Sequence, residues 1–267
     1  TGAQTRAIAE IFDDMTSGRR MNRLLQGDVG SGKTIVALFA MLLAVESGWQ
    51  AALMAPTEIL AEQHARTLAA MVQPLGLDVT LLTGRLPAAA KRAAHESIAS
   101  GAARLVVGTH ALIQEAVQFH RLGIAITDEQ HRFGVKQRLA LAAHGENIDV
   151  LVMSATPIPR SLALTIYGDL DLSVLDELPP HRQKIRTAVR PEERRDAVYQ
   201  FIRDEVGKGR QAYIVYPLVD ESEKVELRAA TAEYERLRLD VFPELRLGLL
   251  HGQMSGEEKD AVMQAFA

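Results

Sequence analysis

The sequence predicts an α/β fold built on a parallel sheet. One observation is a glycine-rich loop between a short apolar run and an apolar helix, and another is the repeated alternation of apolar runs with helical patterns. The apolar runs are continuous, which is typical of strands that are covered on both faces. The composition agrees, because 47% of the 267 residues are hydrophobic and 24% are charged, as in ordinary globular proteins.

The glycine-rich loop runs from Gly27 to Thr34 and matches the pattern G-x-x-x-x-G-K-[ST] of a phosphate-binding loop. Glycines let successive backbone N–H groups surround a phosphate, and the helix that follows adds its positive dipole end. We expect Lys33 to reach the β- and γ-phosphates of a nucleotide and Thr34 to ligate Mg²⁺. The other residues expected at the nucleotide are Gln4, whose amide suits an adenine edge, and Gly27, Asp28, Gly30, Ser31 and Gly32.

The remaining elements follow in order along the chain. Residues 21–26 predict a strand and residues 35–45 a helix, and further buried strands are expected at 50–55, 78–82, 104–108, 123–127 and 150–153. Two prolines then break the pattern, so the predicted division is residues 1–177, a linker at 178–183, and residues 184–267. In the second part we expect strands at 184–189, 211–216 and 245–250, helices at 191–206 and 220–239, and a capped helix from Ser255.

Two adjacent carboxylates, Asp128 and Glu129, follow a predicted apolar strand. Sites of α/β sheets lie at the carboxyl ends of strands, where these side chains are expected. In combination with the phosphate-binding loop, the pattern predicts that Asp128 holds Mg²⁺ and that Glu129 polarises the attacking water. Catalysis would therefore rest on Lys33, Asp128 and Glu129.

A second set of residues also follows predicted strands. Hydroxyl and basic groups at the start of helices can grip a phosphodiester backbone without reading bases, although each is individually more common as a helix cap. The candidates for DNA binding are Thr57, Arg85, Thr109 and His110. The histidines show no metal-ligand spacing, and the chain has no cysteine, which excludes disulfides and Cys-ligated zinc.

Charge and hydropathy narrow the setting. The net charge is −4, so any nucleic-acid site must be a local patch. No apolar run reaches the length of a membrane span and no signal pattern opens the sequence, which favours a cytoplasmic protein with no membrane contact. No stable protein partner is predicted.

Several of these segments resemble helicase motifs. Residues 27–34, 55–64, 109–110, 128–131 and 154–156 are similar in order and spacing to motifs I, Ia, Ib, II and III of superfamily 2. More narrowly, residues 25–34, 54–64 and 128–135 resemble the RecG family of bacterial ATP-dependent DNA helicases, which act on branched or forked DNA in recombination and repair. The resemblance implies a RecA-like ATP-binding lobe followed by a second, truncated RecA-like lobe, and it implies a coupling role for Ser154, Ala155 and Thr156.

The resemblance also implies an arginine-bearing motif beyond Ala267. We therefore expect residues 1–267 to bind ATP with Mg²⁺ and to hydrolyse it very slowly. Three alternatives stay open. The first is a transcription-repair coupling translocase, which shares residues 132–135 but typically differs at Ser31 and Gln130. The second is a nucleotide-dependent DNA-binding module, which would lack productive turnover. The third is a small-molecule kinase, which offers no reason for Asp128 and Ser154 to occur together.

Overall fold

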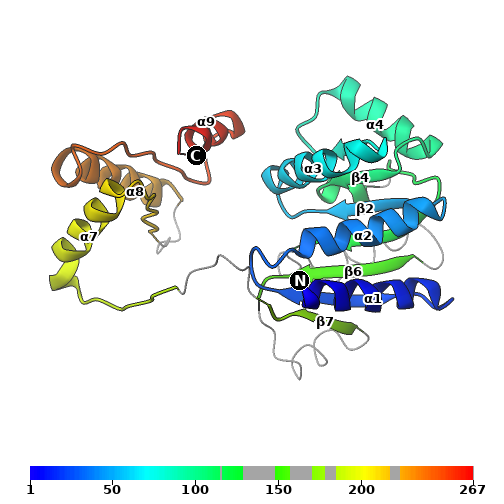
Figure 1. Ribbon diagram of the computed structural model, residues 1–267. Coiled ribbons are helices and arrows are strands. Elements are labelled where there is room, and N and C mark those ends of the chain that lie inside the picture. The colour runs from blue at the N-terminus through cyan, green and yellow to red at the C-terminus, as the bar shows by residue number, and fades with distance from the viewer. Residues whose placement is uncertain (115, 129–147, 157–169, 178–184, 217–222, 267) are drawn as a thin grey trace. The chain divides into compact units, whose positions relative to one another are not determined.

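In the computed structural model, the chain divides into two compact units, Thr1–Gln183 and Lys184–Ala267 (Figure 1). The structure describes residues 1–114, 116–128, 148–156, 170–177, 185–216 and 223–266. The linker predicted at residues 178–183 lies outside these ranges. Among the described residues, no helix combines the length and the apolar content that a membrane crossing requires.

A parallel sheet forms the centre of the first unit, with the strand order β3-β4-β2-β5-β6-β1-β7. Its strands are β1 (Asn22–Gly27), β2 (Gln50–Met54), β3 (Val79–Leu82), β4 (Leu105–Gly108), β5 (Leu122–Thr127), β6 (Asp149–Ser154) and β7 (Asp171–Leu175). Every pairing is parallel. The predicted α/β class is confirmed, and only β7 falls where the sequence did not predict a strand.

Helices cover both faces of this sheet (Figure 1). They are α1 (Gly2–Thr16), α2 (Lys33–Glu46), α3 (Glu58–Val72) and α4 (Ala88–Ser100). The first three pack on one face together with Leu53 and Ile126, whereas α4 packs on the other face with Met54 and Ala125. Neighbouring residues of one strand thus enter opposite cores, as the two-residue period of a strand requires. This arrangement explains why the strands are apolar throughout.

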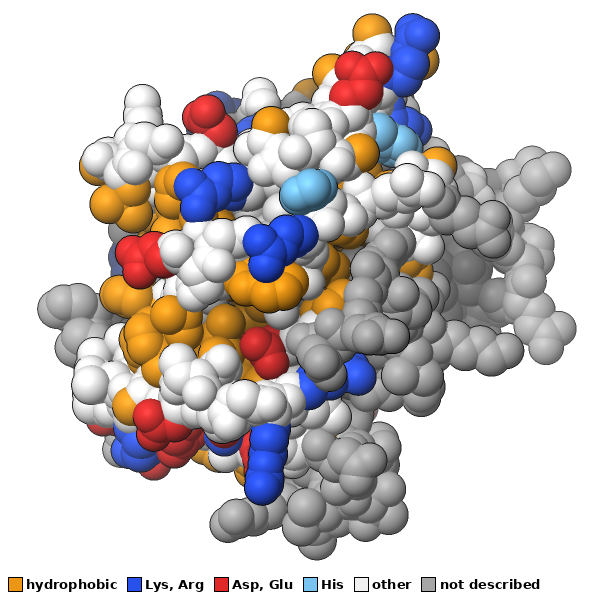
Figure 2. Space-filling view, turned by 90° about the vertical axis from the view of Figure 1, so that its right-hand side faces the viewer, with side chains coloured by type: hydrophobic (Ala, Val, Ile, Leu, Met, Phe, Trp, Pro, Cys, Tyr) orange, Lys and Arg blue, Asp and Glu red, His pale blue; other side chains and the backbone are white. Residues whose placement is uncertain are grey.

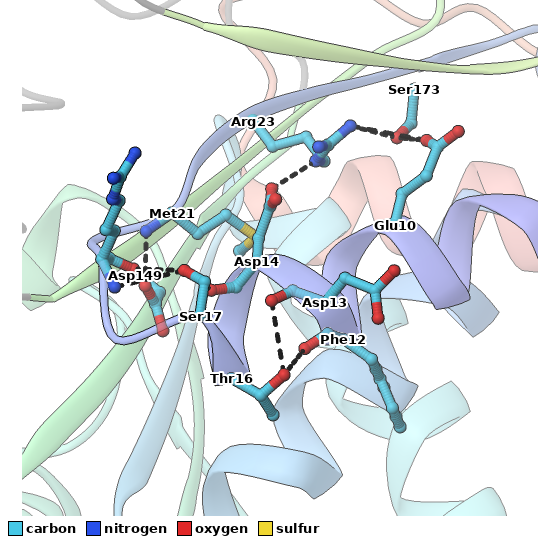
Figure 3. A network of polar contacts seen from close by, with 11 residues as sticks. Glu10, Phe12, Asp13, Asp14, Thr16, Ser17, Met21, Arg23, Asp149 and Ser173 are labelled. Carbon is cyan, nitrogen blue, oxygen red and sulfur yellow. Dashed lines mark hydrogen bonds and ion pairs between the residues drawn. The ribbon is translucent and has the colours of Figure 1, made fainter.

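A buried arginine joins α1 to the sheet (Figure 3). The Arg23 side chain on β1 donates from Nε to Asp14 Oδ2 at 2.7 Å and from Nη1 to Ser173 Oγ on β7 at 2.9 Å. Glu10 Oε2 lies 3.4 Å from the same Nη1. Burying a guanidinium is costly unless it is paired, and these carboxylates provide the pairing. Helix α1 is thereby held beside β1 and β7.

The second unit is described mainly through its helices, α7 (Arg195–Gly207), α8 (Glu223–Arg236) and α9 (Gly256–Phe266). A small core joins Tyr199 of α7 to Phe242, with the rings edge to face and their centroids 5.4 Å apart. The predicted cap at Ser255 is confirmed, because its backbone N–H donates to Glu258 Oε2 at 2.8 Å and its Oγ accepts from Glu258 N at 3.3 Å.

The prediction of three strands in the second unit is wrong for the residues that the structure describes. The described residues of 184–189, and all of 211–216 and 245–250, form no strand. Val189 and Val215 are 91% and 82% exposed, so no neighbouring strand or helix among the described residues covers them. Apolar, β-branched residues favour a strand only where a partner strand supplies ladder hydrogen bonds, and no such partner is present among the described residues.

Candidate functional site

Strand register brings two predicted site segments together at one edge of the sheet. Gln26 of β1 lies opposite Ser154 of β6, and Val152 of β6 lies opposite Thr127 of β5. The phosphate-binding loop that follows β1, Ser154 at the end of β6, and Asp128 after β5 therefore meet at the carboxyl ends of three adjacent strands. This edge is where open α/β sheets bind their ligands.

The loop between β1 and α2 has the backbone of an anion cradle. Gly30 and Gly32 adopt φ values of 81° and 87°, which side-chain-bearing residues rarely adopt. A Cβ on Gly27 would lie 2.6 Å from Ser31 Oγ, so the glycine is also required for space. Lys33 begins α2, and its Nζ donates to the carbonyls of Gly27 at 2.7 Å and Asp28 at 3.1 Å. The Lys33 ammonium therefore lies against the loop that is predicted to hold the phosphates.

Two further atoms fit a nucleotide at this loop. The Ser31 hydroxyl is buried and has no hydrogen-bond partner in the part of the chain that the structure describes. Gln4 reaches the loop from α1, where its Nε2 donates to the Ser31 carbonyl at 2.9 Å. Gln4 also takes part in the capping box of α1 with Thr1. The amide predicted to meet an adenine edge is thus held beside the predicted phosphate site.

Asp128 follows β5 and is 8% exposed. Its backbone N–H donates to the Met54 carbonyl at 2.9 Å, and its Oδ2 lies 2.7 Å from His64 Nε2 of α3. The contact with His64 was not predicted from the sequence. His64 ends the segment 55–64 that resembles helicase motif Ia, and it follows the helix cap Thr57 by seven residues, which returns to the same helix face after two turns. Glu129 lies outside the described residues.

The segment after β6 forms a small hydroxyl turn. Ser154 Oγ and Thr156 Oγ1 are 2.9 Å apart, and Thr156 N donates to Ser154 Oγ at 3.2 Å. Ser154 is 2% exposed, whereas Thr156 is exposed and Ala155 half-buried. The turn therefore stands between the ends of β1 and β5, with one hydroxyl anchored and the other accessible. Its coupling role stays a prediction.

The residues predicted to bind DNA follow the three strands on the other half of the same edge. Register places Met54 of β2 and Leu82 of β3 opposite Gly108 of β4, so the loops after these strands are neighbours. They carry the four predicted residues, Thr57, Arg85, Thr109 and His110. These loops and the nucleotide loop are therefore parts of one continuous edge.

The local roles of these four residues differ. Thr57 Oγ1 caps α3 by accepting from Leu60 N at 3.3 Å. The Thr109 hydroxyl accepts from Ala111 N at 3.5 Å, and Thr109 is only 1% exposed. Arg85 Nε pairs with Glu58 Oε2 at 2.5 Å and its side chain is 50% exposed. Arg85 and the exposed His110 are thus accessible to a phosphate. Thr57 and Thr109 both serve as caps, and of these two only Thr57 is partly exposed.

A hollow of about 260 Å³ lies at the opposite end of the first unit, where the helices end and the strands begin. Figure 2 looks onto this end and shows hydrophobic side chains interspersed with basic and acidic ones. Trp49, Arg20 and Asp149 are among the residues that line the hollow. Burial raises the pKa of the Asp149 carboxyl, and its hydrogen bond from Met21 N, 2.7 Å long, opposes that rise. None of the predicted site residues lines it.

Comparison with known proteins places these features in a family context. The family described as DEAD/DEAH box helicase matches residues 1–165. The chain is 52% identical to the ATP-dependent DNA helicase RecG of Synechocystis sp. and 53% identical to that of Thermotoga maritima, in each case over its whole length. It spans about a third of those relatives, 32% and 34% respectively.

Similarity to solved structures agrees. A structure described as RecG bound to a three-way DNA junction matches all of this chain and 34% of its own, with a TM-score of 0.80 and 48% identity. The structure of the yeast protein Dbp5 bound to RNA and ADP BeF3 has a TM-score of 0.65 at 17% identity, which shows a shared fold alone. The predicted RecA-like fold is thus confirmed.

Proposed function

Because the chain belongs to the DEAD/DEAH box helicase family, we propose that it forms the ATP-binding part of a DNA motor of the RecG type. The observation that carries this proposal is the division of one sheet edge into two halves. The loops after β1, β5 and β6 carry residues predicted to bind the nucleotide or to couple, which we call the nucleotide half. The loops after β2, β3 and β4 carry the residues predicted to bind DNA, which we call the DNA half. A motor needs both ligands to bias the same structural elements.

The nucleotide half is proposed to act by positioning and charge. The backbone of residues 27–34 would hold the phosphates, Lys33 would neutralise their charge, and Gln4 would contact the adenine. Thr34 and Asp128 would hold Mg²⁺, which would offset the negative charge that develops on the phosphates during hydrolysis. Glu129 would orient the attacking water by accepting its hydrogen bond. The buried Ser31 hydroxyl and the Lys33 contacts support this assignment.

The DNA half is proposed to grip the sugar-phosphate backbone. Arg85 and His110 offer basic groups near the N-terminal ends of helical segments, and Thr57 offers a hydroxyl and the backbone of a helix start. Such contacts fix the position of DNA and carry no sequence information. The relatives named RecG, and the structure of RecG bound to a three-way junction, favour branched or forked DNA as the substrate. A nucleoid-associated, cytoplasmic location follows from that substrate.

The turn Ser154-Ala155-Thr156 is proposed to couple the two halves. It follows β6, which lies between β1 and β5. The paired hydroxyls of Ser154 and Thr156 hold the turn in one arrangement, and a shift at either neighbouring strand end would break that pair. Nucleotide hydrolysis and DNA grip would thereby change together.

The test is the ATPase rate of the intact protein with a three-way junction, linear duplex or single strand. We expect the junction to stimulate hydrolysis by more than tenfold over no DNA, and more than the linear duplex does. Lys33→Ala should abolish the stimulated rate while leaving the fold intact by circular dichroism. A rate that no DNA stimulates, or that a small phosphate acceptor stimulates instead, would refute the proposal.

A further inference from the structure

A hydrogen bond connects α3, the helix that begins at the DNA half, to the Asp128 carboxylate of the nucleotide half. His64 Nε2 of α3 lies 2.7 Å from Asp128 Oδ2, across 64 residues of sequence. The two side chains are only 13% and 12% exposed. An ionised carboxylate can only accept, so Nε2 is the donor in this bond. Hydrogen bonds shielded from water hold their geometry more firmly than exposed ones.

The bond restricts how the Asp128 carboxylate turns. One of its two oxygens is occupied by His64, and the backbone N–H of Asp128 is tied to the Met54 carbonyl. Side chains that hydrogen-bond a metal-binding carboxylate orient it, and their loss typically lowers metal affinity or activity about 10- to 100-fold. His64 is thus placed to orient the carboxylate that would hold Mg²⁺.

The same helix carries the predicted DNA contacts at its other end. Thr57 caps α3, and Glu58 in its first turn pairs with Arg85 at 2.5 Å and accepts from Arg85 N at 3.0 Å. His64 follows Thr57 by seven residues, a rise of about 10 Å along the helix axis. Between and beyond them, the inward face of α3 is buried through Ala61, Ala65 and Leu68.

A packed helix of 15 residues moves as one body, so a displacement at its first turn reaches His64. Binding of a DNA phosphate at Thr57 and Arg85 would pull on the first turn of α3 and displace it. His64 would then change its distance or angle to Asp128. The contact therefore joins the two binding events through a single rigid element.

We propose that His64 is a positioning residue that couples DNA contact at the first turn of α3 to Mg²⁺-nucleotide binding at Asp128. This inference rests on the proposed function, since it assigns the route by which one site senses the other. Coupling between two sites is reciprocal, so DNA must raise affinity for the metal-nucleotide by the factor by which the metal-nucleotide raises affinity for DNA. His64 contributes to that factor.

The experiment compares wild type, His64→Ala and His64→Gln in the intact protein, because the glutamine amide supplies a donor at similar reach. His95→Ala on α4 is the matched control, a half-buried histidine in another helix of the same unit. The protein is titrated with a fluorescent, non-hydrolysable ATP analogue under three conditions: in the presence of EDTA, of Mg²⁺, and of Mg²⁺ plus junction DNA. Electron paramagnetic resonance of Mn²⁺ then reports metal affinity directly.

We expect His64→Ala to leave analogue binding in EDTA unchanged, to weaken Mn²⁺ binding about 10- to 100-fold, and to bring the DNA-dependent gain in affinity close to one. His64→Gln should recover most of both losses, and His95→Ala should behave as wild type. Equal metal affinity and equal DNA coupling in His64→Ala and wild type would overturn the inference while leaving the proposed function intact.

A purely structural role for His64 gives a different pattern. In that case His64→Ala would lower thermal stability and would weaken analogue binding in EDTA as well. His64→Gln would not restore the DNA coupling. That pattern also overturns the inference. A wild-type protein in which DNA never changes nucleotide affinity would instead refute the proposed function. The three results are therefore distinguishable.

Discussion

Glu177 Oε1 accepts a hydrogen bond from Ala3 N at 2.9 Å, although the two residues are 174 positions apart. The bond ties the end of the segment after β7 to the first turn of α1, where backbone N–H groups lack partners within the helix. A carboxylate at this position also interacts favourably with the helix dipole. Gln4 follows Ala3 directly, and its Nε2 donates to the Ser31 carbonyl of the phosphate-binding loop, so we expect this anchor to help position Gln4.

Replacing Glu177 by Ala should therefore loosen the first turn of α1. We expect the free energy of unfolding to fall by about 1 kcal/mol, the usual loss for a helix cap, together with a weaker affinity for ATP through Gln4. Asp176→Ala is the control, because Asp176 pairs with Arg6 at 2.9 Å on the exposed side of α1 without capping it. If both variants lower nucleotide affinity equally, the cap does not position Gln4.

Lys33→Ala should abolish nucleotide binding. The substitution removes the ammonium that lies against the Gly27 and Asp28 carbonyls. Isothermal titration calorimetry with an ATP analogue and Mg²⁺ should detect no binding by this variant. Lys91→Ala makes the same change of charge on α4 and should bind as wild type. Unchanged affinity in the Lys33 variant would remove this residue from the site.

Glu129→Gln should separate nucleotide binding from turnover. The amide keeps the shape of the side chain but is a poor base for the attacking water, so we expect hydrolysis to fall about 10²- to 10⁴-fold at nearly unchanged affinity. Glu62→Gln provides a control carboxylate, which lies on α3 and pairs with Arg66 at 3.6 Å. Equal loss of binding and turnover would mean that Glu129 supports the structure instead.

DNA binding should be independent of sequence and sensitive to salt. If Arg85 contacts one phosphate, Arg85→Ala should reduce the slope of log affinity against log salt by about one. Arg66→Ala removes an equally charged but 81% exposed side chain on α3 and should leave the slope unchanged. Affinity measured by fluorescence anisotropy that stays flat from low to high salt would contradict phosphate contact by this half of the edge.

The strand, glycine loop and helix of residues 22–46 are predicted from the sequence for a physical reason. Their signal is local, because a loop of fixed glycine spacing joins the strand to the helix within eight residues, Gly27 to Thr34. Continuous apolar runs likewise predict β2, β4, β5 and β6, since each is buried on both faces. Local patterns suffice where the interactions are local.

Long-range contacts are what local patterns miss. The edge strand β7 has buried and exposed residues mixed over five positions, a weak signal, and it is held by pairing with β1 and by the Arg23–Ser173 hydrogen bond. His64 offers no motif of its own that points to Asp128. In the second unit, the apolar segments ending at Val189 and Tyr216 read as strands but form no ladder among the described residues.

Asp149 should make the stability of the protein depend on pH. Burial raises the pKa of its carboxyl above the ordinary aspartate value. The native state then binds the Asp149 proton more tightly than the unfolded chain does. The contribution of Asp149 to the free energy of unfolding is therefore largest below the unfolded pKa. It falls as pH rises from there through the native pKa, and it stays low at neutral pH.

Asp149→Asn removes this charge and keeps an acceptor for the Met21 N–H, whose bond is 2.7 Å long. We expect the variant to be more stable than wild type at neutral pH. It should lose that advantage as pH falls from the native pKa of Asp149 to the pKa of Asp149 in the unfolded chain. Urea unfolding across a pH series measures this difference, with Asp171→Asn as an exposed control at the start of β7. A variant that is less stable at neutral pH, by a margin that acid does not change, would show that the hydrogen bond to a charged carboxylate outweighs its burial. The hollow beside Trp49 would then be a site where the fold requires a negative charge.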